Sequence, residues 1–98
     1  MEINREINNG VYTIFLKGKL DTLSSPMLDS EVTKIEHDIT KVVLDMSGCD
    51  YISSSGLRSI LILAKKMEGN GELVITQPND YVREVFEMTG FSELLTIK

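Results

Sequence analysis

The chain has 98 residues, of which 42% are hydrophobic and 26% are charged, as is typical of one globular domain spanning residues 1–98. Fifteen acidic and ten basic side chains give a net charge of −5. Because the basic residues are scattered rather than gathered into a stripe, this charge argues against a nucleic-acid partner.

The first 17 residues predict an antiparallel hairpin. Ile3, Arg5 and Ile7 recur at every second position, the period of a half-buried strand at a sheet edge. Residues 8–10, Asn-Asn-Gly, tolerate positive φ angles and suit a tight turn. Residues 11–17 are rich in β-branched and aromatic side chains, so we expect a second strand that pairs with the first.

An amphipathic helix is predicted next. Residues 18–21, Gly-Lys-Leu-Asp, are expected to break the strand, and hydroxyl side chains then precede Pro26, a residue suited to the first helical position. We expect the helix to run from about residue 25 to residue 38. Its apolar stripe steps by four and three residues and consists of Leu28, Val32 and Ile35.

The second half alternates strands and helices. Residues 41–45 form an apolar run without alternation, which predicts a parallel strand covered on both faces. A helix follows the serines at 53–55 and ends at the glycines of residues 69–71. Residues 72–76 predict another buried strand. The apolar stripe of the helix before it consists of Leu57, Ile60, Leu61, Ala64 and Met67.

The last segment predicts a helix and a strand. Asn79 or Asp80 can cap the helix, and Gly90 ends it. Residues 94–97 read as the final strand. The stripe of this helix consists of Val82, Val85, Phe86 and Thr89.

The order β-β-α-β-α-β-α-β predicts an α/β fold with a mixed, mostly parallel sheet and an N-terminal antiparallel hairpin. In such sheets the loops that leave the carboxyl ends of the strands form the functional edge. Residues 18–26, 46–55 and 77–80 are the expected loops. Asp21 and Ser54 would then lie on the same edge.

The Ser-Ser-Ser-Gly run at residues 53–56 has two interpretations. Serine is favoured at a helix N-cap, and one serine is enough for that role. Alternatively, a phosphate on one of the serines would meet the unpaired N–H groups and the positive dipole end of the helix. The residues alone leave a structural cap and a phosphorylation site equally open.

Enzymatic chemistry is disfavoured. A serine nucleophile needs a nearby base, and the only histidine, His37, lies just before the central strand, whereas the serines follow it. Across this five-residue strand the separation is roughly 16 Å at ~3.3 Å per residue, far beyond hydrogen-bond range. Asp45 could be read as a phosphoryl-accepting aspartate, but the cluster of acids that would hold Mg²⁺ is missing, so we interpret it as a turn residue aided by Ser47. We expect no catalytic residues.

No cofactor, metal or membrane is expected either. The glycine pattern offers no nucleotide-binding loop, and Cys49 and His37 cannot make a four-ligand zinc site. We expect Cys49 to be a small, partly buried side chain. The longest apolar run, residues 60–64, is far short of the ~20 residues that span a bilayer, and no signal peptide is evident, so we expect a cytoplasmic protein.

One apolar residue is predicted on the polar side of the second helix. At about 100° per residue, Ile62 projects to the side that also carries Arg58 and Ser59. A single exposed isoleucine is common on protein surfaces. Its place beside the serine run also suggests a protein contact.

The residues that carry these signals resemble a STAS domain of the bacterial anti-sigma-factor antagonist type. The resemblance covers nearly the whole chain, in the order residues 18–21, 42–47, 51–57 and 85–91. It implies a binding protein, not an enzyme, in a partner-switching pathway. Ser54, two positions before Gly56, is the serine that a kinase doubling as the anti-sigma factor would phosphorylate and that a PP2C-type phosphatase would restore. Only the unphosphorylated form would bind the anti-sigma factor.

Two positions depart from the pattern of many relatives, in which acids stand at the places of Lys19 and Ser53. Both changes alter the charge at the expected partner surface. An alternative function is a constitutive STAS scaffold in a larger complex, for example one for lipid transport, in which the serines only cap the helix. The expected partner-binding residues are Asp21, Thr22, Ser53, Ser54, Ser55, Arg58 and Ile62.

Overall fold

The chain forms five strands and four helices, which a computed structural model describes in full from Met1 to Lys98. The elements are β1 (Glu2–Asn8), β2 (Val11–Leu20), α1 (Ser25–Val32), β3 (Lys41–Ile52), α2 (Ser54–Met67), β4 (Glu72–Thr76), α3 (Asp80–Met88), α4 (Phe91–Leu94) and β5 (Thr96–Ile97).

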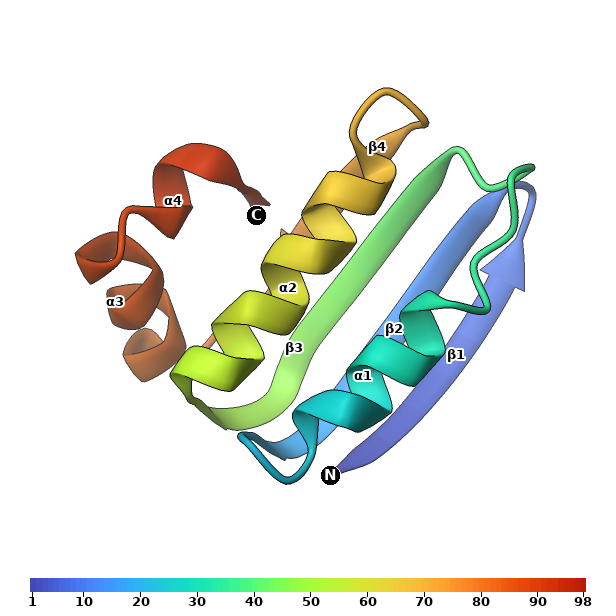
Figure 1. Cartoon of the computed structure of the whole chain (residues 1–98). Helices are drawn as coiled ribbons and strands as arrows, with labels where there is room; N and C mark the ends of the chain where they lie inside the picture. Colours follow the sequence, from blue (N-terminus) through green and yellow to red (C-terminus); the bar gives the residue numbers. More distant parts are fainter.

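The strands lie side by side in sequence order, from β1 to β5 (Figure 1). β1 and β2 are antiparallel, and every later neighbouring pair is parallel. Asn9 and Gly10 connect the hairpin with φ angles of 51° and 79°, values that an Asn-Gly turn accommodates. The predicted mixed sheet with an N-terminal hairpin is confirmed.

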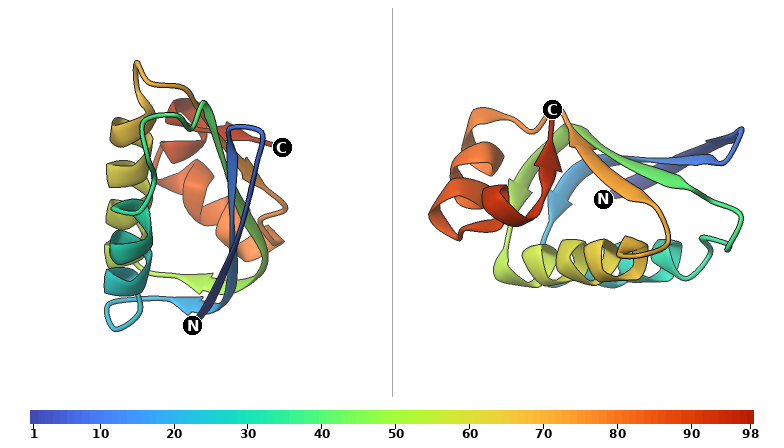
Figure 2. Two further views of the ribbon diagram at one scale, coloured as in Figure 1. Left: turned by 90° about the vertical axis from the view of Figure 1, so that its right-hand side faces the viewer. Right: turned by 90° about the horizontal axis from the view of Figure 1, so that it is seen from above.

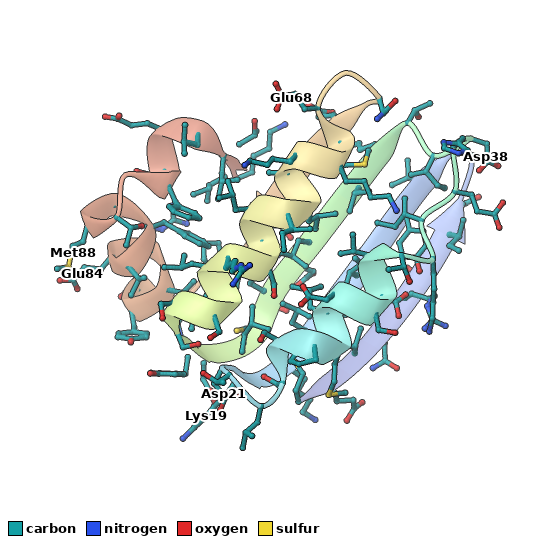
Figure 3. The ribbon with its side chains drawn as sticks, in the orientation of Figure 1. Lys19, Asp21, Asp38, Glu68, Glu84 and Met88 are labelled. Atoms are coloured by element: carbon teal, nitrogen blue, oxygen red, sulfur yellow. The ribbon has the colours of Figure 1, made fainter.

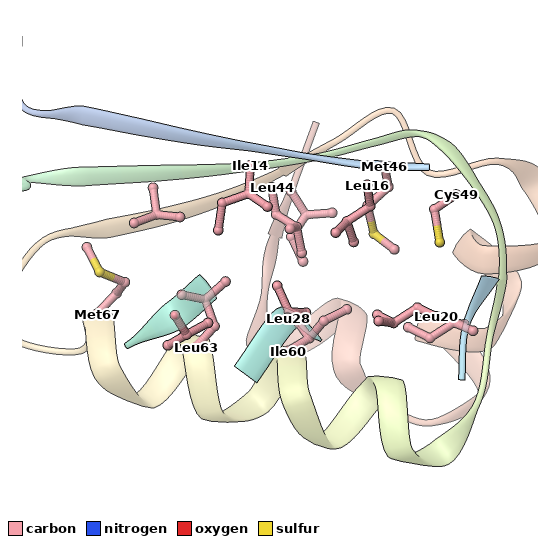
Figure 4. Packing of buried hydrophobic residues seen from close by; sticks show 14 of the residues in the cluster. Ile14, Leu16, Leu20, Leu28, Leu44, Met46, Cys49, Ile60, Leu63 and Met67 are labelled. Carbon is pink, nitrogen blue, oxygen red and sulfur yellow. The ribbon is translucent and has the colours of Figure 1, made fainter. Parts of the chain in front are cut away.

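The core lies between one face of the sheet and the helices, as Figure 4 shows. Alternate residues of β2 and β3, such as Ile14 and Leu44, point toward Leu28 of α1 and Ile60 of α2. All four side chains are fully buried. Burial of this one apolar face fixes the register of the strands, because a slip by one residue would turn it toward water.

The opposite face of the sheet has no helix over it in either view of Figure 2. Val43 of β3 is half-buried there, beside Thr13 of β2 in the register. The prediction that residues 41–45 are covered on both faces is therefore wrong. The reason is that β-branched side chains suit a pleated surface with or without a second layer, so the run did not distinguish the two cases.

β2 and β3 are longer than predicted. The expected break at residues 18–21 comes only at Asp21, because β2 runs on to Leu20. β3 continues past Asp45 to Ile52, so most of the expected loop at residues 46–55 is strand. Two register shifts interrupt the pairing of the strands, and Gly18 sits at one of them with a φ of 105°. The glycine marks a β-bulge rather than a turn.

α1 is shorter than predicted and ends at Val32 instead of residue 38. The Val32 carbonyl oxygen at the helix end accepts from the Ile35 N–H at 3.2 Å and from the Lys66 ammonium at 2.7 Å. The following segment returns to the sheet, where the Thr40 N–H donates to the Gly10 carbonyl at 2.9 Å. Ile35 and Ile39 stay buried without a helix.

The C-terminal part confirms α3 and adds a short helix. The Asn79 side chain caps α3 by accepting a hydrogen bond from the Val82 N–H at 2.7 Å. Gly90, with a φ of 81°, ends the turn after α3, but the chain then forms α4, and β5 shrinks to Thr96–Ile97. The final order therefore has two helices before the last strand. None of the helices has the length and apolar character needed to cross a lipid bilayer.

Candidate functional site

The ends of β2 and β3 and the start of α2 meet at one end of the molecule, at the bottom of Figure 1. We call this end, residues 19–24 and 51–58, the serine edge. The Ser53 N–H donates to the Leu20 carbonyl at 2.9 Å and joins the two strand ends. Figure 3 shows Lys19 and Asp21 close together there.

The three consecutive serines have different surroundings. Ser53 is the N-cap of α2, and its hydroxyl accepts a hydrogen bond from the Gly56 N–H at 3.3 Å. The Ser55 hydroxyl lies 3.1 Å from that of Thr22, which links α2 to the loop after β2. Ser54, the first residue of α2, is exposed, and its hydroxyl makes no hydrogen bond within the protein. The N-cap among the three serines is thus Ser53, and the serine with a free hydroxyl is Ser54.

Gly56 sets how closely α2 approaches the strands. A Cβ atom at this position would lie 2.7 Å from the Leu20 carbonyl oxygen and 3.0 Å from Cγ1 of Ile52. Only a residue without a side chain fits there. The position of the serines relative to β2 therefore depends on this glycine.

Asp21 organises the loop after β2. Its carboxylate accepts hydrogen bonds from the Leu23 N–H at 3.1 Å and from the Ser24 N–H at 3.0 Å. The bond from the Ser24 N–H is the main reason that the pKa of Asp21 is lowered. The Ser24 hydroxyl donates to the Lys19 carbonyl at 2.6 Å and does not cap α1, although hydroxyl caps were predicted in this segment. Asp21 thus fixes the loop that carries Thr22.

The outer side of α2 continues the exposed surface away from the serines. Arg58 is exposed, and Ile62 is 44% exposed, as its projection on the helix predicted. Ser59, on the same side, is buried. This side of α2 is therefore partly covered, and Ile62 lies at the margin.

The other candidate groups lie elsewhere. His37 is exposed before the start of β3, at the opposite end of that strand from Ser54. Cys49 is buried more completely than expected, and burial raises the pKa of its thiol. The Asp45 carboxylate accepts from the Ser47 N–H at 2.9 Å, the predicted local bond, though within β3. No three His, Cys, Asp or Glu side chains are grouped as metal ligands.

The sequence did not reveal a pair of tyrosines beside the serine edge. The rings of Tyr51, from β3, and Tyr81, from α3, stack with centroids 5.8 Å apart and planes 12° apart. The two residues are 30 positions apart in the chain, so no local pattern signals the contact. A hollow of about 350 Å³ lies next to Tyr51.

Residues 2–98 match the family model of the STAS domain. BtrV of Bordetella bronchiseptica, which is named as a "Putative anti-sigma factor antagonist", is 33% identical over 99% of this chain and 85% of its own length. The anti-sigma-B factor antagonist of Staphylococcus aureus is 25% identical over 99% of this chain and 92% of its own. The Bacillus protein SpoIIAA, solved in its phosphorylated form, has the same fold, with a TM-score of 0.77 at 18% identity over 99% of this chain and 91% of SpoIIAA. The two sequence relatives above are thus both named as anti-sigma factor antagonists, and the protein belongs to the STAS domain family.

Proposed function

We propose that the protein is an anti-sigma factor antagonist whose binding is switched off by phosphorylation of Ser54. The observation that carries this proposal is the surroundings of the serines. Ser53 and Ser55 use their hydroxyls in hydrogen bonds, whereas Ser54 presents a free one at the start of α2. The names of the relatives favour this function over a constitutive scaffold.

The position of Ser54 suits a reversible phosphate. A phosphoserine carries a charge of about −1.5 to −2, and the first N–H groups of a helix lack intrahelical partners. The phosphate would therefore be stabilised by the helix end. Because Ser54 is exposed, the added group displaces nothing in the core. The switch would act on the partner rather than on the fold.

The proposal assigns the protein a role in binding, without a catalytic function, in the cytoplasm. Its partners are a serine-protein kinase that is also the anti-sigma factor, and a PP2C-type phosphatase that removes the phosphate. The unphosphorylated form binds the kinase and frees the sigma factor. The proposed contact residues are Asp21, Thr22, Ser53, Ser54, Ser55, Arg58 and Ile62.

The test is phosphorylation of the purified protein by the serine-kinase anti-sigma factors of its source organism. We expect intact-mass analysis to find one added phosphate with ATP, and none in Ser54→Ala. Ser53→Ala and Ser55→Ala are the matched controls and should still be phosphorylated. Undiminished labelling of Ser54→Ala would refute the assignment.

Binding by the same kinase tests the switch. Ser54→Ala should bind like the unmodified protein, whereas Ser54→Asp should bind at least tenfold more weakly, because a charge enters the contact surface. The melting temperatures of the two variants should differ little. Equal affinity of the two variants would count against the switch.

A further inference from the structure

Tyr51, from the serine edge, and Tyr81, from α3, form an exposed aromatic surface. Their side chains are stacked on one another, yet the two residues remain 38% and 46% exposed. Leu23, in the loop after β2, is 89% exposed. We call Tyr51, Tyr81 and Leu23 the tyrosine platform.

The pair is held in place by the start of α3. The Asn79 side chain accepts from the Val82 N–H at 2.7 Å and donates to the Cys49 carbonyl at 3.5 Å. One side chain thus caps α3 and ties it to β3, two residues before Tyr51. Tyr81 is the second residue of α3, so this contact helps to hold it against Tyr51.

Two residues of the platform, Tyr51 and Leu23, belong to the serine edge itself. The hollow of about 350 Å³ beside Tyr51 is also lined by Leu23 and Ser53, and the latter immediately precedes Ser54. A protein surface that rests on the platform and fills this hollow would therefore reach Ser53, the residue before Ser54. The remaining lining residues are Lys19, Asp21 and Thr22, which provide a polar rim.

We propose that the tyrosine platform is the apolar anchor for the anti-sigma factor kinase, contacted by an apolar or aromatic side chain of that partner. The inference rests on the proposed function. Tyrosine is enriched among the residues that contribute most to protein interfaces, and a side chain already fixed by stacking loses little freedom on binding. A polar rim around an apolar centre is the usual anatomy of such a contact.

The platform also explains how a phosphate on Ser54 prevents binding. Burying a charge without a partner is costly, and the phosphate would lose its water where the kinase covers the platform. The lost affinity would then reflect desolvation as well as repulsion. Tyr51 and Tyr81 would contribute to the affinity for the kinase, and a phosphate on Ser54 would prevent binding.

The experiment measures the dissociation constant of the complex between this protein and the purified kinase that phosphorylates it. Tyr81→Ala and Tyr51→Ala should each raise this dissociation constant at least tenfold. The fold increase of the double variant should be smaller than the product of the two single increases, because the two stacked rings act as a unit. Met88→Ala is the matched control. Met88 is 78% exposed at the other end of α3, beside Glu84 in Figure 3, and its change should leave binding within twofold.

The outcomes separate this inference from the proposed function. If Ser54→Asp loses binding but Tyr81→Ala binds like wild type, with both folded by circular dichroism, the platform proposal is overturned and the switch stands. If Tyr81→Ala leaves kinase binding unchanged but converts a dimer to a monomer in sedimentation, the platform is a self-association surface, which also overturns it. A wild-type protein that no such kinase binds or phosphorylates would overturn both.

Discussion

At the scale of single residues, Glu31 is the acid that joins α1 to the hairpin. Its side chain is buried, yet it accepts hydrogen bonds from the Arg5 guanidinium of β1, one of them 2.7 Å long, and from the Tyr12 hydroxyl of β2. Lys34 adds a weaker contact at 3.7 Å. The carboxylate is thus paired and hydrogen-bonded, as a buried charge needs to be.

Glu31 also makes the stability of the fold depend on pH. The hydrogen bond from Arg5, the largest cause, lowers the pKa of Glu31 from 4.5 to about 2. Because the folded pKa lies below the unfolded one, this stabilisation is complete above about pH 5 and is lost as the pH falls toward 2. Burial, the largest cause, raises the pKa of Tyr12 to about 12, so its neutral form is favoured and its contribution fades only above pH 10.

We expect Glu31→Gln to lower the free energy of unfolding by about 3 kcal/mol at pH 7, because Arg5 and Tyr12 lose an ionised acceptor. The variant should also lose less stability than wild type between pH 5 and pH 3. Urea unfolding at several pH values measures both effects. Glu36→Gln, at an exposed position, is the control and should behave like wild type. A wild-type-like pH profile in Glu31→Gln would contradict this account.

At the scale of elements, the start of α2 is fixed by its contact with the end of β2. We expect Gly56→Ala to lower stability by about 2 kcal/mol, because its Cβ would lie 2.7 Å from the Leu20 carbonyl oxygen. The change is informative because alanine otherwise favours a helix over glycine by ~1 kcal/mol. Chemical unfolding measures it, with Ser54→Ala as the control in the same turn. A stabilised Gly56→Ala would show that the contact is looser than described.

The elements that the sequence predicted well are those with local signals. The Asn9–Gly10 turn, the N-cap at Ser53 and the Asn79 cap each depend on residues within a few positions of one another. The ends of β2 and β3 depend instead on pairing across 30 residues, and a bulge glycine such as Gly18 has the composition of a turn. Boundaries were therefore missed where the deciding contact was distant in the chain.

The residues of the candidate site likewise divide into those that the sequence could place and those that depend on contacts distant in the chain. Strand and helix order placed Asp21 and Ser54 at one end of the sheet, because the carboxyl ends of parallel strands gather there. Which serine has a free hydroxyl follows from the bond between Thr22 and Ser55, 33 residues apart. The stacking of Tyr51 on Tyr81 likewise depends on how α3 packs on β3, which no pattern in the sequence specifies.

At the scale of the whole molecule, the sheet has a core on one side only. Neighbouring residues of β3 make the contrast sharp, since Leu44 is fully buried under the helices and Val43 is half-buried on the uncovered face. We expect Leu44→Ala to lower the free energy of unfolding by about 3 kcal/mol and Val43→Ala by about 1 kcal/mol or less.

Urea unfolding of the two variants at equal protein concentration makes the comparison, with wild type as the reference. A large cost for Val43→Ala that grows with protein concentration would mean that a second copy covers the face in solution, because association stabilises the folded state by mass action. A cost near that of Leu44→Ala at every concentration would contradict the one-sided core. A small cost of Val43→Ala that does not depend on protein concentration would mean that the core on the helix side of the sheet is the source of stability. Ser54 is exposed and lies outside that core, so a charge added there would leave the stability of the domain unaffected.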